Sequence, residues 1–325
     1  MRYSLIILKI IFLLFNSQKI YSQEFLKTTI IETCIENDFL NVTGKRTDRY
    51  YSSGMNLTVY YLQNQSKRHL LDNSLLIFKN DYLKKYSWGI TQKIYTPDNV
   101  FEPNHFLFDW TYAGTLYATH AVHSINAKKN TVLTSEVWLG VLGPASLAEQ
   151  TQWEYHKLIR VRKPRGWESE IQTMMILNYS LKIERKLFSN KYCNLNVNSD
   201  ATFGTLLNQG GAGFQLRLGK LNNYFDLKTQ NNNFYFTCTS NINFMLYNAY
   251  LQGNFFNSTN QTELINAERK LPASEINNFY TENSLGINYT GKRISVAYKQ
   301  VFWSPFTKHT ERHSYGSITL GLKVK

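Results

Sequence analysis

Every second residue is apolar near the end of the chain. The apolar positions are Ile318, Leu320, Leu322 and Val324, and the residues between them are polar or small. A period of two is typical of a β-strand with one apolar and one polar face. Residues 54–61, 284–289 and 294–302 alternate in the same way. The chain is therefore expected to be rich in half-buried strands.

Further segments bring the number of predicted strands to about a dozen. They lie at 32–39, 86–95, 112–122, 132–141, 171–186, 193–206, 212–219, 234–244 and 246–256. A strand that crosses a membrane needs ~9–11 residues, and bacterial barrels use an even number of strands. We therefore predict an all-β transmembrane barrel of the outer-membrane type, with about 12 antiparallel strands and with its apolar alternate residues facing lipid.

One segment interrupts the strand pattern. Residues 144–158 contain mostly good helix formers, which predicts a short helix from about 147 to 158. Ser146 is a candidate N-cap, and Glu149 would complete a capping box. Gln152 and His156 are four residues apart, so they would share one face of this helix at a barrel mouth.

The N-terminus predicts export. Residues 1–22 resemble a secretory signal peptide, with an apolar core from Leu5 to Phe15 that is too short to span a membrane, and an uncleaved anchor is the alternative. Residues 23–325 would then form a single barrel domain. Three cysteines at wide spacing predict no disulfide framework, although a Cys193–Cys238 bridge stays open.

Composition and charge agree with an outer-membrane protein. The chain has 22 Tyr, 20 Phe and 6 Trp, as expected if aromatic girdles mark both membrane interfaces, although a soluble β-sandwich can also be aromatic-rich. Loss of Arg2, Lys9 and Lys19 with the signal peptide lowers the net charge from +13 to +10. This charge favours an anionic lipid or lipopolysaccharide partner over nucleic acid in an exported chain, with ordinary compositional bias as the alternative.

Five motifs carry the candidate chemistry. They are Asn37-Asp38, the segment from Thr47-Asp48-Arg49 to Gly54, Gln92-Lys93-Ile94-Tyr95-Thr96-Pro97, Asp109-Trp110-Thr111-Tyr112-Ala113-Gly114, and Gly143-Pro144 followed by Gln152, His156 and Gly166-Trp167. In this order and spacing they resemble the outer-membrane lipid A 3′-O-deacylases of the LpxR type. The resemblance runs from about residue 36 to residue 167.

The resemblance implies a Ca²⁺-dependent ester hydrolase that removes an acyl chain from lipid A. His156 would be the general base that takes a proton from water, and Gln152 would orient the reacting groups. Asp38 and Asn37 would supply hard oxygens to Ca²⁺, with Asn37 also near the oxyanion. Ser52 aligns with a hydroxyl of the family site. A Ser52 nucleophile is the rival scheme, but no Gly-x-Ser-x-Gly elbow surrounds it, so direct attack by water is preferred.

Basic residues after the predicted helix extend the hypothesis to the substrate. Lys157, Arg160 and Arg162 are candidates to bind the phosphates of lipid A, and a solvated basic loop is the alternative reading. Arg162 stands where some members of the family carry an acidic residue, Phe39 replaces a second acidic residue, and Trp110 replaces an arginine. We expect a monomer in the bacterial outer membrane.

The sequence is also compatible with two rival functions. One is a non-catalytic barrel that acts as a channel or lipid-binding protein, and the other is an outer-membrane phospholipase. A passive channel does not need Asn37, Asp38, Ser52 and His156 to converge at one end of the barrel, so their placement separates the hypotheses.

Overall fold

The computed structural model describes residues 29–43, 48–62, 70–78, 83–101, 109–221, 232–254 and 270–324. The predicted signal peptide, together with Thr47 and Lys325 of the sequence patterns, lies outside the described residues.

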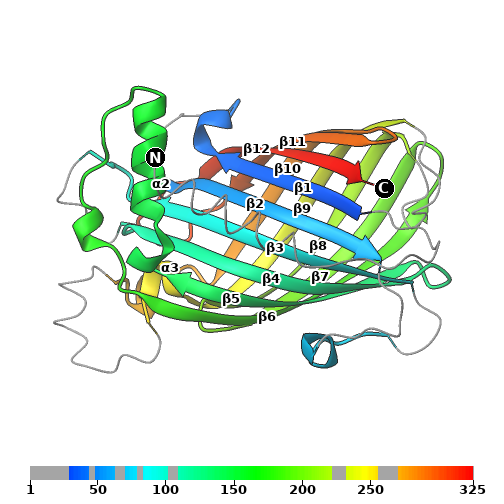
Figure 1. The fold of residues 1–325 in the computed structure, drawn as a ribbon, viewed down its shortest axis with the longest axis horizontal. Coiled ribbons are helices and arrows are strands. Elements are labelled where there is room, and N and C mark those ends of the chain that lie inside the picture. The colour runs from blue at the N-terminus through cyan, green and yellow to red at the C-terminus, as the bar shows by residue number, and fades with distance from the viewer. Residues whose placement is uncertain are drawn as a thin grey trace, which may run out of the picture.

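The described part of the chain forms a closed barrel of twelve antiparallel strands, each paired with its neighbours in chain order (Figure 1). The strands are β1 (Thr29–Asn37), β2 (Tyr50–Leu62), β3 (Leu83–Thr96), β4 (Ala113–Asn126), β5 (Thr131–Leu142), β6 (Met174–Ser189), β7 (Cys193–Gly204), β8 (Leu207–Lys220), β9 (Asn233–Asn248), β10 (Phe279–Thr290), β11 (Ile294–Trp303) and β12 (His313–Val324). Pairing of β1 with β12 closes the sheet. The predicted all-β barrel of about 12 strands is confirmed.

The two faces of the strands follow the predicted alternation. On β12 the side chains of Leu320, Leu322 and Val324 are exposed on the outer wall, whereas Ser317 and Gly321 are buried on the lumen side. Each of the twelve strands overlaps a predicted one. The additional strand predicted at 246–256 is wrong, because β9 ends at Asn248 and the short helix α3 (Ala249–Gln252) follows, capped by Asn248.

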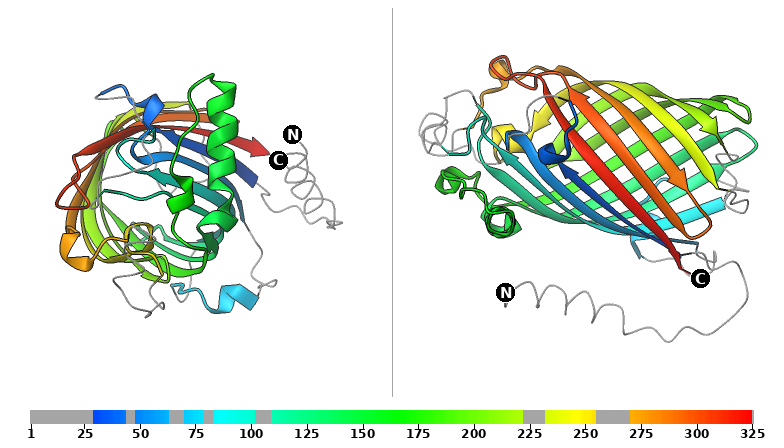
Figure 2. Two further views of the ribbon diagram at one scale, coloured as in Figure 1. Left: turned by 90° about the vertical axis from the view of Figure 1, so that its left-hand side faces the viewer. Right: turned by 90° about the horizontal axis from the view of Figure 1, so that it is seen from above.

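The helical segments gather mainly at one end of the barrel. Those at this mouth are η1 (Asp38–Leu40), η3 (Pro144–Ser146), α2 (Ala148–Leu158), η4 (Trp167–Ser169), α3 and η5 (Ala273–Glu275), and α2 lies across the mouth (Figures 1 and 2). The chain ends of β1 and β12 and several tight turns lie at the other end. Outer-membrane barrels carry short turns on the periplasmic side, which assigns the helical mouth to the outside. None of the helices in the described ranges combines the length and the apolar character needed to cross a membrane.

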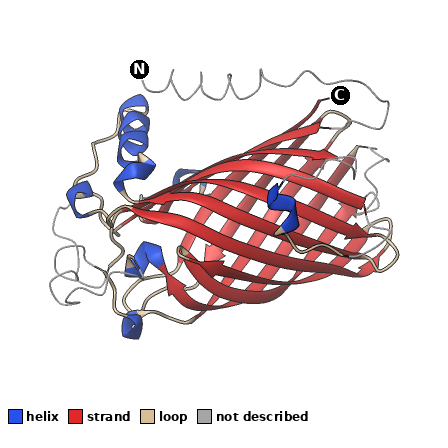
Figure 3. Ribbon diagram, turned by 60° about the horizontal axis from the view of Figure 1, so that its bottom comes forward, coloured by secondary structure: helices blue, strands red, loops and turns tan. Residues whose placement is uncertain are grey.

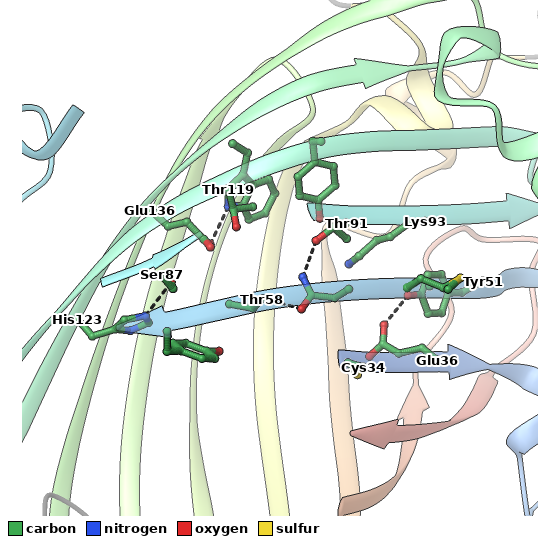
Figure 4. Close-up of a pocket in the computed structure, with 16 residues that line it drawn as sticks. Cys34, Glu36, Tyr51, Thr58, Ser87, Thr91, Lys93, Thr119, His123 and Glu136 are labelled. Atoms are coloured by element: carbon green, nitrogen blue, oxygen red, sulfur yellow. Dashed lines mark hydrogen bonds between the residues drawn. The ribbon is translucent and has the colours of Figure 1, made fainter. Parts of the chain in front are cut away.

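Aromatic side chains fill the lumen beneath the helical mouth. Tyr95 stacks on Trp110 with ring centroids 4.9 Å apart, and Tyr51 packs against Tyr315 at 4.8 Å. These rings belong to a large buried cluster that also includes Tyr250 of α3. Below this aromatic plug the lumen becomes polar, and Glu36, Lys93 and Glu136 lie around a cavity of about 340 Å³ (Figure 4).

A single irregularity marks the start of β2. Tyr51 pairs with Tyr95 and Ser53 pairs with Ile94, so Ser52 is an extra residue in the ladder. Such a β-bulge shifts the side chains on either side of it out of strict alternation.

The helix α2 begins one residue later than predicted, and its capping differs. Leu147 precedes it in the left-handed conformation (φ 59°) and offers no side-chain cap. Ser146 belongs to the preceding turn, and its hydroxyl accepts a hydrogen bond from the Ala148 amide at 3.3 Å. The predicted capping box with Glu149 is therefore wrong, because the N-cap position is occupied by Leu147.

Close packing on Gly114 holds α2 against β4, which gives a first prediction. A Cβ at Gly114 would lie 2.1 Å from the Ala148 Cβ and 2.5 Å from the Ser146 Oγ. Gly114→Ala should therefore push α2 from the wall at a cost of about 1–3 kcal/mol, as overpacking does. Trypsin should then cleave after Lys157 faster than in the unmodified protein, while heat-modifiable gel mobility still reports a folded barrel.

Gly210→Ala is the matched control for this prediction. A Cβ there meets only the Asp200 carbonyl oxygen, at an ordinary 3.4 Å, so cleavage should stay unchanged. Equal cleavage rates in all three proteins would show that Gly114 does not position α2.

Candidate active site

A cavity of about 440 Å³ lies between α2 and the ends of β1 and β3. Its lining consists of Asn37, Asp38, Phe39, Asp48, Asp98, Asn99, Val100, Phe101, Tyr155, His156, Ile159 and Val161. The structure thus brings three predicted site residues, Asn37, Asp38 and His156, to one cavity from separate elements. Ser52 lies near the same end, at the start of β2, but does not line the cavity.

The chain turns at Asn37, the last residue of β1. Its side-chain Oδ1 accepts a hydrogen bond from the Phe39 amide at 2.8 Å and caps η1. Asn37 therefore forms an Asx-type turn, in which an asparagine side chain bonds the backbone two residues further on. This turn places Asp38 at the start of η1, where its carboxylate is only 2% exposed and accepts a hydrogen bond from the Arg49 amide at 3.2 Å.

The Asp38 carboxylate is electrostatically strained. Burial and the negative charge of the nearby Asp48 hold its pKa well above the usual range of an aspartate, although backbone amides from Arg49 and Phe39 act in the opposite direction. A cation in the cavity would offset both the desolvation and the repulsion between these carboxylates.

The imidazole of His156 has an oxygen partner at each ring nitrogen. Nδ1 lies 2.8 Å from the Arg162 carbonyl oxygen, and Nε2 lies 2.6 Å from Oδ2 of Asp48. A doubly protonated ring donates to both oxygens. Burial alone would lower the pKa of His156, but the hydrogen bonds with Asp48 and with the Arg162 carbonyl outweigh it and raise the pKa above the ordinary value.

The end of α2 explains why the Arg162 carbonyl reaches His156. Arg160 adopts the left-handed conformation (φ 58°), and its amide donates to the Lys157 carbonyl at 3.3 Å. The Val161 amide donates to the His156 carbonyl at 2.9 Å. These two bonds form a Schellman-type helix end, which reverses the chain and carries Arg162 back beside the last turn of the helix.

Two predicted site residues serve other contacts. The hydroxyl of Ser52 is buried and hydrogen-bonded to Oγ1 of Thr96 at 2.6 Å. Gln152 is on the same face as His156, as predicted, but its Oε1 accepts a hydrogen bond from Nε1 of Trp167 at 2.9 Å. Gln152 therefore fastens α2 to η4, and it does not line the cavity.

The basic residues of the substrate hypothesis lie outside the cavity. Lys157, Arg160 and Arg162 are all exposed at the end of α2. The Arg162 guanidinium lies over the ring of Phe101, 5.5 Å from its centroid, and Phe101 lines the cavity. Arg162 is therefore at the cavity rim. Its carbonyl contacts His156, and its guanidinium contacts Phe101.

The donor atoms of the cavity suit a hard cation such as Ca²⁺. Asp38 and Asn37 offer a carboxylate and an amide oxygen, and Asp48 adds negative charge to the same space. Within the described residues no group of three or more His, Cys, Asp or Glu side chains is arranged to hold a metal. A bound Ca²⁺ would therefore require backbone carbonyls or waters to complete its shell.

Asp48 lies in direct contact with His156, but the sequence pattern assigned it no role. It belongs to a recognised motif, but its partner His156 is 108 positions away, so no local spacing reveals the pair. Arg49, the next residue, helps to hold this segment in place. Its guanidinium pairs with Asp98 at 3.1 Å and with Glu311 at 2.9 Å.

The closed barrel with a polar, carboxylate-lined site at its outer mouth defines an outer-membrane β-barrel protein with a surface site. The family model described as "Outer membrane protein LpxR" matches residues 6–324, and the chain belongs to this family. The resemblance to LpxR-type lipid A deacylases is thereby confirmed.

A solved structure shows the same fold. LpxR from Salmonella typhimurium matches with a TM-score of 0.71 and 16% identity, over 90% of this chain and 99% of that one. The β domain of the Bordetella autotransporter BrkA (TM-score 0.44, 8% identity, 92% and 99% coverage) is too distant to support an argument. Comparison with curated proteins gave no match.

The His156–Asp48 contact leads to a second prediction. Asp48→Asn removes the negative charge that raises the pKa of His156, so this pKa should fall below ~6.5, since burial then dominates. An NMR pH titration of labelled histidines in detergent, with the His156 signal assigned by its loss in His156→Gln, measures the change.

Glu275→Gln provides the control, because it removes the exposed Glu275–His309 contact (2.9 Å) far along the chain and should leave the His156 pKa unchanged. An unchanged His156 pKa in Asp48→Asn would contradict the assigned electrostatic role of Asp48.

Proposed function

We propose that this protein is a Ca²⁺-dependent lipid A deacylase, which hydrolyses a 3′-O-linked acyl ester with a water activated by His156. The observation that supports this function is the convergence of Asn37, Asp38 and His156 on one cavity at the outer mouth. Family membership supports an outer-membrane lipopolysaccharide substrate. The aromatic plug in the lumen does not favour a passive channel.

The lining of the cavity combines two chemically distinct groups of side chains. Phe39, Val100, Phe101, Ile159 and Val161 offer apolar surface that suits an acyl chain. Asn37, Asp38 and His156 supply the polar groups beside which an ester would react. The exposed Lys157, Arg160 and Arg162 would contact lipid A phosphates beside this cavity.

The chemical step requires Nε2 of a neutral His156. Because the Arg162 carbonyl occupies Nδ1 and Asp48 occupies Nε2, Asp48 must leave Nε2 before that nitrogen can accept a proton. A water oxygen then bonds to the ester carbonyl carbon as its proton passes to Nε2. When the carbon–oxygen bond to the sugar breaks, the imidazolium returns this proton to the leaving oxygen.

The residues around His156 hold the base in place during these transfers. Nδ1 donates to the Arg162 carbonyl throughout, which fixes the ring orientation. Asn37 and Asp38 would hold Ca²⁺, which when bound supplies positive charge to polarise the ester carbonyl. The Ser52 hydroxyl is hydrogen-bonded to Thr96, and Ser52 does not line the cavity. Both observations support attack by water over a covalent route.

Mass spectrometry of lipid A from cells with and without this protein tests the activity and gives a third prediction. The unmodified protein should cause loss of one ester-linked acyl chain, and His156→Ala should reduce turnover by ~10²–10⁴-fold, as loss of a general base does. Ser52→Ala should retain measurable activity. Acyl loss from phospholipid with intact lipid A would favour a phospholipase, and a Ser52→Ala variant as inactive as His156→Ala would favour the covalent route.

The raised pKa of His156 leads to a fourth prediction. Because the neutral ring is the base, activity should increase with pH through a limb centred above ~6.5. In Asp48→Asn the limb should move to lower pH. The pH dependence of kcat/KM on purified lipid A measures this limb in the unmodified protein and in Asp48→Asn. A limb at the same pH in the two proteins argues against His156 as the titrating base.

Metal dependence provides a fifth prediction with a readout besides activity. Ca²⁺ should raise the thermal unfolding temperature because it binds the folded site, and EGTA should reverse this rise and abolish deacylation. Asp38→Asn should lose the Ca²⁺-dependent shift, whereas Asp200→Asn in β7, outside the cavity lining, should keep it. Full deacylation in excess EGTA would remove the metal from the mechanism.

A further inference from the structure

The outer wall of the barrel contains an unexpected ionisable residue. Successive strand pairs align Val59, Trp88, His120, Val137 and Tyr179 in one row across β2 to β6. Thr119, the neighbour of His120 in β4, lines the lumen cavity (Figure 4). Because successive side chains of a strand point to opposite faces, His120 faces outward. An ionisable side chain in such an apolar row would be costly against lipid.

A segment of the β2–β3 connection covers this residue. Residues 70–78, here named the strap, include the short helix η2 (Leu70–Asn73) and lie outside the ring of strands (Figures 2 and 3). Oδ1 of Asp72 lies 2.8 Å from Nε2 of His120, and the two side chains are only 3% and 2% exposed. Nδ1 of His120 faces the Ser87 carbonyl at 3.2 Å, so both ring nitrogens have oxygen partners.

Other contacts fasten the strap along the same wall. The Leu76 amide donates to the Ser135 hydroxyl at 3.1 Å and to the Tyr179 hydroxyl at 3.0 Å. Leu75 is buried against Tyr86 and Val122. The wall therefore provides polar partners for the Leu76 amide, and irregular backbone is tolerated at membrane depth where protein groups satisfy and cover it in this way.

Ser74 and Leu76 of the strap are exposed, and Leu76 continues the apolar lipid-facing wall. Leu76 is 55% exposed, and the wall residues Trp88 and Leu139 are 40% and 46% exposed. His120 precedes the end of β4 by six residues, which is about 20 Å along a strand and about 15 Å along the membrane normal for a tilted strand. This distance places the strap within the hydrocarbon region and on the periplasmic half.

We propose that the strap is a membrane-embedded element, with Leu76 facing the acyl chains of the inner-leaflet phospholipids and the Asp72–His120 pair anchoring it. The strap then covers a polar patch on the outer wall and shields it from contact with lipid.

Site-directed spin labelling tests the location. A nitroxide is placed at Leu76→Cys in a protein whose Cys34, Cys193 and Cys238 are serines, reconstituted in vesicles of phosphatidylethanolamine and phosphatidylglycerol. Labels at Leu139→Cys on the outer wall and at Tyr192→Cys in the β6–β7 turn serve as lipid and water references. Collisions with oxygen and with a water-soluble nickel chelate are measured.

We expect the label at position 76 to match the one at 139, with nickel accessibility several-fold below that at 192. Nickel accessibility equal to that at 192 would place the strap in water and overturn the proposal. Low accessibility to both reagents would show that protein covers Leu76, and this result would also overturn it.

A second pair of variants tests the anchor in the same labelled protein. Asp72→Ala leaves His120 without its carboxylate partner, so the strap should leave the wall and nickel accessibility at position 76 should rise several-fold. Asp72→Ala combined with His120→Leu removes both polar partners and should return the label to its lipid value. Unchanged accessibility in Asp72→Ala would show that the pair does not anchor the strap.

Discussion

Hydrogen bonding between the first and last strands is the constraint on which the rest of the molecule depends. In a membrane every backbone polar group must find a partner within the protein, so the sheet must close. The closing register pairs Thr29 with Val324 and continues to Asn37 with Gly316. It therefore fixes where β1 ends and where Asp38 begins η1. A Cβ at Gly316 would lie 2.2 Å from the Leu40 carbonyl oxygen, so η1 packs directly on β12. The position of the candidate metal ligands thus follows from barrel closure.

The strands were predictable from the sequence because lipid on one side and a polar lumen on the other impose a period of two. Leu320 and Leu322 show this constraint directly, since both are exposed on the outer wall. The helix α2 was predictable for the complementary reason that its segment lacks that period. The helix α3 was missed because Ala249–Gln252 is too short to show a period of its own.

The candidate site was predictable in part, from its motifs. Asn37, Asp38 and His156 converge on the cavity, but no pattern along the chain indicates that Ser52 hydrogen-bonds to Thr96 or that Gln152 hydrogen-bonds to Trp167. These partners lie in other elements, and only the register and the packing of the barrel bring them into contact. The role of Asp48 was hidden for the same reason.

Two histidine–aspartate contacts lie among the described residues, in different surroundings. Asp48 is 21% exposed at the edge of the cavity, so its contact with His156 can be exchanged for water or ligand. Asp72 is 3% exposed and its contact with His120 is sealed between the strap and the wall. The same pair of side chains thus belongs to a reactive cavity in one place and to the outer wall in the other. Access to solvent separates the two cases.

The β-bulge at Ser52 determines how this strand can change in length during evolution. Tyr51 and Gly54 both line the lumen, although residues three apart in a regular strand face opposite sides. Deletion of Ser52 would leave Tyr51 paired with Tyr95 and Ser53 paired with Ile94, so the ladder would become regular and Tyr51 would still face Glu36, whose carboxylate accepts its hydroxyl hydrogen bond at 2.5 Å. A one-residue deletion elsewhere in β2 would instead turn the residues on one side of it to the opposite face of the wall. Position 52 is therefore the place where β2 can lose a residue while the lipid-facing side and the aromatic plug both keep their members.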